Sequence, residues 1–371
     1  MDKVKIAIIG TSWWTEAMYL PALTNHPQAE VLALCGRNLA RAQQVAQAWN
    51  VSRAFVDVET MLDKLSLNAL IIATDNDGHY PFSMQAMSKG LHVLCEKPLS
   101  EDLSLAEAMA AEAKARGIIS MVPFTYSFMP SLRYVKDLID EGYLGKGHHF
   151  SMRYYAGFGL SHDYAWRFDA RYSPGGMLGD LGSHFLYIAT WLFGEVEGLF
   201  CHLDTLAKHA DKDPKGQDFP KANDSAIITL KFKNGMQGHV HATAVAYEGT
   251  NFNQRHMMEF HGDKGTLYHE NDWDYLDVVK GTKVGEGPIK VLDLPAVYVD
   301  GIRRDQVHNT YKDVFREKDF MARAFITQIA QHKAGQSPKA LKPDFSDGAY
   351  VQKLVDTALK SHQQGKWLRV H

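Results

Sequence analysis

The first part of the 371-residue chain, to about residue 120, alternates short apolar runs with amphipathic segments, and this alternation limits the possible folds more than any other feature of the sequence. A continuous apolar run is typical of a strand buried on both faces, and an amphipathic segment between two such runs is typical of a crossover helix. The apolar runs are Ile6–Ile9, Val31–Cys35, Ala69–Ala73, His92–Cys95 and Ile118–Val122. They predict an α/β, Rossmann-like domain with a parallel sheet.

The helical segments between these runs carry capping signals. Asn38 is expected to cap the helix of "LARAQQVAQAW". A later helix is expected to open at Ser100 with acidic residues in its first turn, and to end with Lys114, Arg116 and Gly117. Both ends of that helix then suit its dipole.

The sequence pattern changes after about Pro123 to strand-like segments, and Asn234-Gly235 is a strong hairpin signal between two of them. We therefore expect two domains, residues 1–123 and 124–371, the second an α/β domain with a large open, mainly antiparallel sheet. The polar segment Ala207–Lys221 is expected to be an exposed excursion. A capped helix over about 344–364 could pack back on the first domain.

The composition argues against several classes of protein. A net charge of -3 and a pI near 6.6 give no indication of nucleic acid or membrane partners. The first apolar run is too short for a signal segment, and no stretch approaches about 18 apolar residues. Cys35, Cys95 and Cys201 lie far apart, and none of the 18 histidines has metal-motif spacing. We expect scattered structural and surface histidines, reduced thiols, no metal and a cytoplasmic location.

The turn after the first strand carries an incomplete dinucleotide fingerprint. The pattern G-x-G-x-x-G/A corresponds here to Gly10, Ser12 and Thr15, so one glycine of three is present. A Cβ at Ser12 would press against a pyrophosphate, and Thr15 is expected to loosen the packing of helix on strand. The hydroxyls of Thr11 and Ser12 can bind phosphate oxygens, as can the helix N-terminus. The next residue, Trp13, or its neighbour Trp14 either covers the cofactor, lines the substrate entrance or packs inside.

The end of the second strand indicates which cofactor is bound. A site specific for NAD places an acidic residue there to bind the ribose 2′-OH, whereas this chain has Gly36, Arg37 and, one helical turn later, Arg41. A guanidinium can pair with a 2′-phosphate and lie over adenine, which favours NADP(H) over NAD(H). The alternative is an ordinary surface arginine beside a helix start.

Two further clusters suit catalysis. "CEKPL" places Lys97 at the carboxyl end of a strand, where open parallel sheets bind ligands, and a cis Lys97–Pro98 bond would direct the side chain into the crevice. Asp180 and His184 are four residues apart, so a helix would place both on one face and pair a carboxylate with a general acid/base. The alternatives are a proline that ends a strand beside solvated charges, and a helix N-terminus capped by Asp180 with an exposed His184.

Together these residues resemble the Gfo/Idh/MocA family of oxidoreductases. The fragments that carry the resemblance are "IIATDNDGHYPFSMQAMSKGLHVLCEKPLS", "WRF" with "GGMLGDLGSH", "EFHGDKGTL" and "PDFSDGAYVQKLVDTALKSHQQGKW". The resemblance implies a dinucleotide-binding Rossmann domain, a substrate-binding domain and hydride transfer at a carbinol carbon of a sugar, polyol or cyclic alcohol. It also implies a homo-dimer or homo-tetramer formed through the open sheet.

The resemblance assigns roles residue by residue. Lys97 matches the lysine that contacts the reacting hydroxyl, Asp180 and His184 match the family's aspartate and acid/base histidine, and Glu96 matches the acid near the nicotinamide ribose. Further matches border the nicotinamide half of the cofactor, at Thr74, Asn76 and His79, and the substrate, at Trp166 and Arg167. Asp75 stands where the family usually has proline.

One departure from the family concerns the substrate. Thr125, Tyr126 and Ser127 replace the asparagine and arginines that relatives often carry. An anionic substrate gripped by arginine is therefore less expected than a neutral polyhydroxy or partly aromatic one. The aromatic residues that favour such a substrate are Tyr126, Tyr155, Trp166 and Tyr187.

The chain is thus expected to be a dehydrogenase or reductase that uses NADP(H), with NAD(H) as the second choice. Two alternatives remain: a redox-assisted glycosidase that uses its bound cofactor only transiently, and a non-enzymatic regulatory or sensor protein that keeps the fold. The incomplete glycine motif favours the sensor, and the joint presence of Lys97, Asp180 and His184 favours an enzyme.

Overall fold

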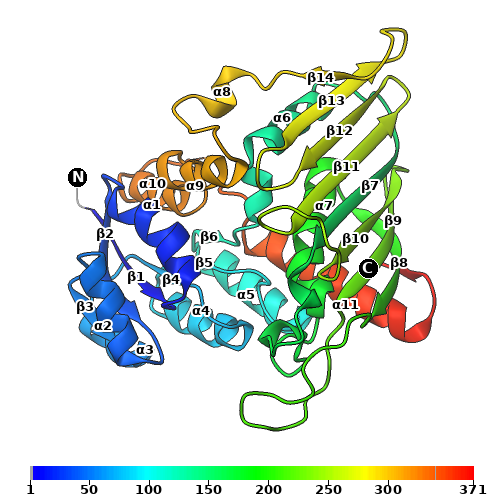
Figure 1. The fold of residues 1–371 in the computed structure, drawn as a ribbon. Helices are drawn as coiled ribbons and strands as arrows, with labels where there is room; N and C mark the ends of the chain where they lie inside the picture. Colours follow the sequence, from blue (N-terminus) through cyan, green and yellow to red (C-terminus); the bar gives the residue numbers. More distant parts are fainter. Residues whose placement is uncertain (1–2, 339) are drawn as a thin grey trace. The chain divides into compact units, whose positions relative to one another are not determined.

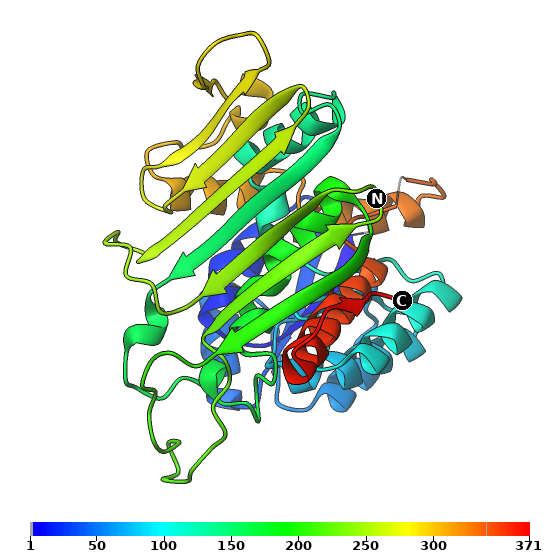
Figure 2. The same cartoon turned by 90° about the vertical axis from the view of Figure 1, so that its right-hand side faces the viewer.

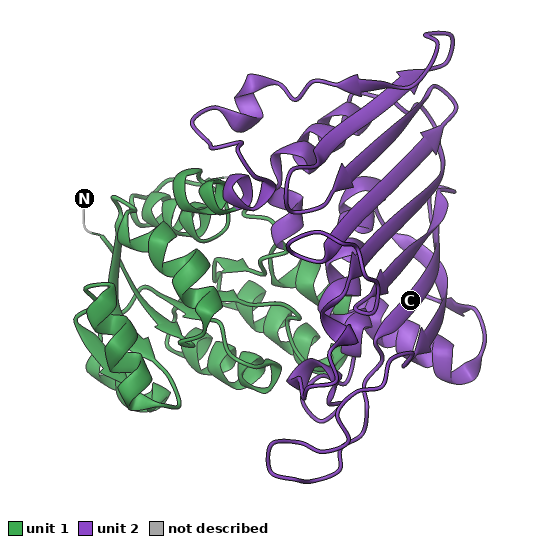
Figure 3. Cartoon of the chain, viewed as in Figure 1, with its two compact units in different colours: residues 1–124, 312–352 green, residues 125–311, 353–371 purple. Residues whose placement is uncertain are grey.

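Two sheets, one parallel and one mixed, form the framework of the chain in the computed structural model, which describes residues 3–338 and 340–371 (Figure 1). Contacts between residues divide the chain into two units (Figure 3). The first comprises residues 1–124 and 312–352, and the second comprises residues 125–311 and 353–371. The expected ranges, 1–123 and 124–371, differ from these units mainly in residues 312–352.

The described residues of the first unit form a six-stranded parallel sheet in the order β3-β2-β1-β4-β5-β6. Its strands are β1 (Val4–Ile9), β2 (Ala29–Cys35), β3 (Arg53–Phe55), β4 (Ala69–Ile72), β5 (His92–Cys95) and β6 (Ser120–Met121). The five expected strands are confirmed. The short strand β3 was not expected, because three residues with partial burial produce no apolar run.

Helices connect these strands and cover the sheet. They are α1 (Leu20–Thr24), α2 (Leu39–Ala48), α3 (Val58–Lys64), α4 (His79–Ser88) and α5 (Leu103–Ala115), with a π-helical turn at Thr15–Tyr19 and a 3-10 turn at Asn76–Gly78. Asn38 caps α2 as expected, since its side chain accepts a hydrogen bond from the Arg41 amide. The expected start of α5 at Ser100 is wrong: Asp102 is the cap, because its carboxylate accepts from the Leu105 amide.

A later segment returns to the first unit. It contains the end of α9 (Val307–Glu317), α10 (Ala322–Lys333) and the start of α11 (Phe345–Gln364). Arg316 and Arg323 donate to the carbonyl oxygens of Ala17 and Ala22, and the Phe345 amide donates to Ser120 Oγ at 3.2 Å. Residues far apart in the sequence therefore complete one unit.

The second unit contains a nine-stranded sheet within the described residues, in the order β14-β13-β12-β11-β7-β10-β9-β8-β15. Its strands are β7 (Gly147–Ala156), β8 (Val196–Asp204), β9 (Ser225–Phe232), β10 (Gln237–Thr243), β11 (Gln254–Gly262), β12 (Gly265–Asn271), β13 (Asp277–Lys283), β14 (Lys290–Leu292) and β15 (Leu368–Arg369). The pairs are antiparallel except β7 with β10. The expected open, mainly antiparallel sheet is confirmed, as is the hairpin at Asn234-Gly235, where Gly235 has φ +92°.

One face of this sheet is buried and the other is open, as Figure 2 shows for the face turned to the viewer. In β9 buried and exposed residues alternate, so that Ile228 and Leu230 lie in the core while Ile227 and Thr229 are exposed. The helices of the unit are α6 (Pro130–Asp140), α7 (Ser183–Phe193) and α8 (Ala296–Val299), with 3-10 turns at Thr125–Phe128, Phe158–Leu160 and Trp166–Phe168 and a π-helical turn at Leu178–Gly182. Helix α7 is almost entirely buried and supplies much of the core.

Two further expectations concern exposed and apolar segments. The segment from Ala207 to Lys221 is largely exposed, as expected, although His209, Asp213 and Phe219 are buried anchors. In residues 3–338 and 340–371, no helix combines the length and the apolar character needed to cross a membrane.

Candidate functional site

The turn after β1 brings the chain close to the neighbouring strand β4. Gly10 has φ +112°, and a Cβ at this position would overlap the carbonyl group of Ala73. Only glycine fits such an approach. The next helix begins at Trp13, so its first backbone N–H groups, which lack partners within the helix, lie directly after this turn.

Thr15 does not loosen the packing of this helix, contrary to expectation. Its side chain is fully buried, and its hydroxyl donates to the Gly10 carbonyl oxygen at 3.1 Å. A π-helical turn, which holds one more residue than an α turn, starts at Thr15. The turn and the helix are thereby connected through a side chain that replaces the third glycine.

A buried carboxylate, Glu96, connects this helix to the strand end that carries Lys97. Glu96 Oε1 accepts from Trp14 Nε1 at 2.6 Å and from the Tyr19 hydroxyl at 2.5 Å, and Oε2 accepts from the Lys97 amide at 3.2 Å. Trp13 is 69% exposed, so of the two tryptophans it is Trp14 that takes the inner position. No local sequence pattern signals this contact, because Trp14 and Glu96 lie 82 residues apart.

Replacing Glu96 with glutamine is expected to stabilise the protein at about pH 8, and this gain should shrink as the pH falls towards about 4. Burial raises the pKa of Glu96 despite its hydrogen bonds and the nearby Lys97 charge. A carboxyl group whose pKa rises on folding stabilises the fold below its unfolded pKa and loses that contribution as the pH rises through the folded pKa. Glutamine keeps an acceptor for Trp14 and Tyr19 but cannot ionise, and its amide nitrogen in place of Oε2 loses the hydrogen bond from the Lys97 amide equally at every pH. Urea unfolding at several pH values measures the difference.

The control for this measurement is Glu30→Gln, which removes an exposed carboxylate from β2 of the same unit. It should produce no difference that grows with pH. An effect of Glu96→Gln that is equal at every pH would contradict the assignment of a raised pKa.

His79 fixes the loop after β4 to the turn after β5. Its Nδ1 lies 2.7 Å from the Pro98 carbonyl oxygen and its Nε2 lies 3.3 Å from that of Thr74. Both partners are carbonyl oxygens, which can only accept, so a neutral imidazole with one N–H donates to one of the two. The Lys97–Pro98 bond is cis, as the sequence suggested. His79 is therefore placed to position these two loops, and Asn76 is buried in the 3-10 turn just before it, within the loop after β4.

The arginine after β2 has a partner that was not anticipated. Arg37 Nη2 lies 2.8 Å from Asp75 Oδ2, in the loop after β4. Arg41 is engaged separately, with Glu16 on the first helix and with Gln44. Of the two arginines expected near a 2′-phosphate, Arg37 is thus the more exposed, at 89% against 37% for the Arg41 side chain.

In the second unit, the structure brings Asp180 and Arg167 together. Arg167 Nε donates to Asp180 Oδ2 at 3.0 Å, and the guanidinium lies over the Trp166 ring at 4.6 Å. Asp180 belongs to the π-helical turn that leads into α7, and His184 lies in the first turn of that helix. π-Helical turns are frequent at functional sites, and here the turn carries the predicted aspartate.

His184 is buried against Tyr126, with the two ring centroids 4.6 Å apart. The Tyr126 hydroxyl lies 2.6 Å from that of Tyr154, which accepts from Gln254 Nε2 at 2.7 Å. Burial raises the pKa of Tyr126 to about 12, so its phenol stays protonated at neutral pH. Hydrogen bonds thus join Tyr126, which packs on the predicted acid/base, to Tyr154 and Gln254, and the sequence did not indicate the latter two.

The structure does not bring Tyr155 to this group. Successive residues of a strand point to opposite faces of the sheet, so Tyr154 meets Tyr126 whereas Tyr155 faces the other side. There its hydroxyl lies 3.0 Å from His241 Nδ1. Tyr187 is buried on α7. We therefore replace Tyr155 with Tyr154 among the candidate residues.

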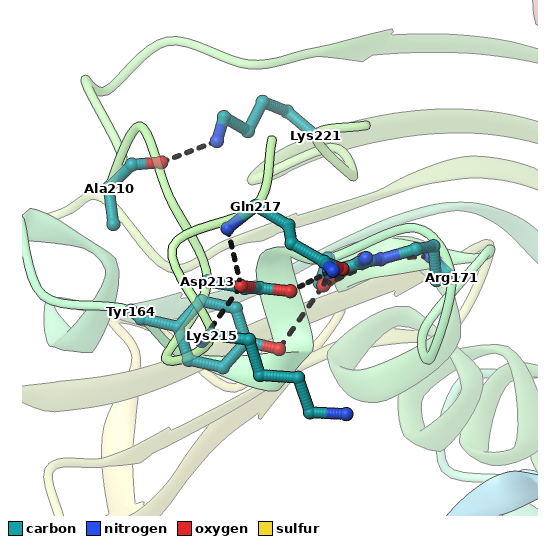
Figure 4. A network of polar contacts seen from close by, with 8 residues as sticks. Tyr164, Arg171, Ala210, Asp213, Lys215, Gln217 and Lys221 are labelled. Carbon is teal, nitrogen blue, oxygen red and sulfur yellow. Dashed lines mark hydrogen bonds and ion pairs between the residues drawn. The ribbon is translucent and has the colours of Figure 1, made fainter. Parts of the chain in front are cut away.

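The polar excursion, Ala207–Lys221, is anchored to Arg171 through Asp213 (Figure 4). Arg171 pairs with the buried Asp169 and with Asp213, at 2.6 and 2.9 Å. Asp213 also accepts from the amides of Lys215 and Gln217, which fixes the tip of the excursion. Nearer to Arg167, the ring of Phe168 stacks on buried His209 at 4.0 Å. Residues well separated in the sequence thus support the Trp166–Phe168 turn.

The described side chains include no group of three or more His, Cys, Asp or Glu arranged to hold a metal ion. The three cysteines are free and buried. Burial raises the pKa of Cys35 to about 11 and that of Cys201 to about 12, so both remain thiols at neutral pH.

A parallel sheet of this order, with a close glycine turn after β1 and a helix N-terminus beyond it, defines the class of dinucleotide-binding α/β proteins. The comparisons with known proteins agree. The protein-family model described as "Oxidoreductase family, NAD-binding Rossmann fold" matches residues 4–124. The family model of the "GFO/IDH/MocA C-terminal domain" matches residues 132–268. The chain belongs to the Gfo/Idh/MocA family of oxidoreductases.

Individual relatives match over most of their length. An uncharacterised oxidoreductase of Synechocystis sp. is 29% identical over 378 residues, which cover 98% of this chain and 95% of the relative. Levoglucosan dehydrogenase of Pseudarthrobacter phenanthrenivorans is 28% identical over 369 residues, with coverages of 94% and 90%. A solved structure of levoglucosan dehydrogenase with NADH and L-sorbose superposes with a TM-score of 0.86 at 23% identity, covering 100% of both chains, which shows the fold.

Proposed function

We propose that this protein is an NAD(P)-dependent oxidoreductase that transfers a hydride between a nicotinamide and a carbinol carbon of a sugar, polyol or related cyclic alcohol. The observation that carries this proposal is the position of Asp180, which Arg167 holds one helical turn before His184. The other unit of the same chain is a dinucleotide-binding fold. The name of the levoglucosan dehydrogenase relative supports a sugar-like substrate.

Each of the three catalytic candidates has a distinct role in the proposed reaction. His184 exchanges the hydroxyl proton of the substrate, and the positive charge of Lys97 stabilises the developing alkoxide. Asp180 orients the imidazole or binds a neighbouring hydroxyl, and its ion pair with Arg167 keeps its carboxylate in place. A bound nicotinamide would supply or accept the hydride. In the direction of reduction, His184 donates the proton that it otherwise accepts.

The residues of the first unit fit a dinucleotide. The Gly10 turn and the N–H groups that follow it suit a pyrophosphate, and Glu96 Oε2 keeps acceptor capacity for a ribose hydroxyl after accepting from the Lys97 amide. The other candidate cofactor residues lie at the same strand ends or in the adjoining loops, namely Thr11, Ser12, Trp13, Arg37, Thr74, Asn76 and His79. We propose NADP(H) as the preferred cofactor because Arg37 offers a guanidinium to the 2′-phosphate.

We also propose that copies of the chain associate as dimers or tetramers through the open face of the nine-stranded sheet. This face exposes large apolar side chains such as Phe200 and Ile227, which a partner would cover. Sedimentation analysis of the wild-type protein tests this, and a monomer at high concentration would contradict it.

The proposed activity is tested by assaying a panel of neutral sugars, polyols and cyclic alcohols with NADP+ and with NAD+. The absorbance of the reduced nicotinamide measures turnover. Turnover with a neutral alcohol supports the proposal. Turnover without net change in cofactor absorbance would indicate the redox-assisted glycosidase, and ligand binding without turnover would indicate a sensor.

Replacing Arg37 with alanine is expected to weaken NADPH binding by about tenfold or more, because a charge-assisted pair with phosphate is lost. NADH has no 2′-phosphate, so its binding should stay within about twofold. Isothermal titration calorimetry measures both dissociation constants, with Arg53→Ala on β3 as a control for the loss of an exposed arginine. Equal weakening of both cofactors would contradict the role of Arg37.

A further inference from the structure

The ion pair between Arg37 and Asp75 spans the strand end at which a dinucleotide would bind. Arg37 follows β2 by two residues and Asp75 follows β4 by three. Strand β1 lies between β2 and β4 in the sheet, so the pair bridges the carboxyl ends of its two neighbours. The Gly10 turn leaves β1 at that same end, and the Thr11 side chain lies close to Gly36.

This pair is not needed to hold the fold. The side chain of Arg37 is 89% exposed and that of Asp75 is 42% exposed, and ion pairs at such positions contribute little to stability. The loop that carries Asp75 is held instead by His79 and by the Thr74 hydroxyl, which donates to the Asp75 carbonyl oxygen. The Asp75 carboxylate is therefore able to exchange its partner without disturbing the loop.

Asp75 and a 2′-phosphate require the same partner. The guanidinium of Arg37 is engaged through Nη2 by a carboxylate, and a phosphate binds a guanidinium through the same N–H groups. A phosphate would have to displace the Asp75 carboxylate or share Arg37 with it, and two anions at one guanidinium repel each other. NAD(H), which carries a free ribose hydroxyl, meets no such competition.

We propose that Asp75 is a specificity-determining residue, which lowers the preference for NADP(H) by competing with the 2′-phosphate for Arg37. This inference rests on the dinucleotide site of the proposed function. Asp75 thereby allows the chain to bind both cofactors even though the position after β2 carries an arginine in place of an acid.

The test is a calorimetric titration of NADPH and of NADH into the wild type and four variants, which measures the dissociation constants. Asp75→Asn removes the charge and keeps the shape of the side chain. Asp77→Asn is the matched control, because it removes an exposed carboxylate two residues away in the same loop. Arg37→Ala and the double variant Arg37→Ala/Asp75→Asn complete a double-mutant cycle, which isolates the coupling between the two residues.

Asp75→Asn is expected to tighten NADPH binding about fivefold, the factor that an exposed ion pair can contribute, and to leave NADH binding unchanged. Asp77→Asn should change neither, and the gain from Asp75→Asn should vanish in the Arg37→Ala background. Weaker NADH binding by Asp75→Asn would overturn the proposal and make Asp75 a ribose acceptor. Equal gains from both asparagine variants, or no gain, would also overturn it while leaving the dinucleotide site intact. Absence of any nicotinamide binding to the wild type would overturn the proposed function as well.

Discussion

Replacing His184 with asparagine is expected to lower kcat about 1,000-fold on whichever neutral alcohol the wild type turns over fastest, because general acid/base catalysis contributes roughly a factor of 100 to 10,000. The dissociation constant for the nicotinamide cofactor should not change, since the cofactor residues of the first unit are untouched. Steady-state kinetics and calorimetry on the same preparation measure both quantities.

The buried position of His184 requires a control for structural damage. His269 is also a buried histidine of the second unit, and it hydrogen-bonds Ser131 and Asp277. His269→Asn should therefore share any general cost of losing a buried imidazole while keeping turnover. A loss of kcat that is equal in both variants would contradict a catalytic role for His184. Retained turnover in His184→Asn would contradict it directly.

Replacing Gly10 with alanine is expected to destabilise the first unit by about 3 kcal/mol or more. Part of this cost comes from the positive φ of Gly10, and the rest comes from the overlap of the new Cβ with the backbone carbonyl of Ala73 on the loop after β4. Since this turn is also the proposed pyrophosphate site, cofactor affinity should fall with it. Urea unfolding and calorimetry measure the two effects.

Gly90 offers a matched control for this substitution. Its φ is +75°, and a Cβ there would meet no atom within 4 Å. Gly90→Ala therefore carries the conformational strain without the overlap and should cost about 1 kcal/mol. The difference between the two variants isolates the close approach of β1 and β4. Similar costs in both would show that the Ala73 segment moves aside.

Much of the fold could be predicted because local signals agree with the tertiary structure. The apolar runs mark β1, β2, β4 and β5 within two residues at each end, and Asn234-Gly235 marks a hairpin. The start of α5 was missed because Ser100 and Asp102 are both good capping residues, and the choice depends on which side chain reaches a helical amide. Local sequence does not carry that information.

The candidate site was harder to predict, because its residues are selected by register and by distant contacts. Tyr154 and Tyr155 are adjacent and chemically identical, and only the pleat of β7 decides which of them meets Tyr126. The partners of Glu96 and Arg37, namely Trp14 and Asp75, lie 82 and 38 residues away from them. Asp180 and His184 could be paired from the sequence because their spacing is helical.

The return of residues 312–352 to the first unit sets an order of events during synthesis. The six described strands of the parallel sheet have all been made by Met121, yet Arg316, Arg323 and Phe345 donate hydrogen bonds to carbonyl and hydroxyl groups of that unit. Domains that are continuous in sequence can fold one after another from the N-terminus as they leave the ribosome. Here the first unit can be completed only after the strands from β7 to β14 have been translated, so its completion comes late in synthesis.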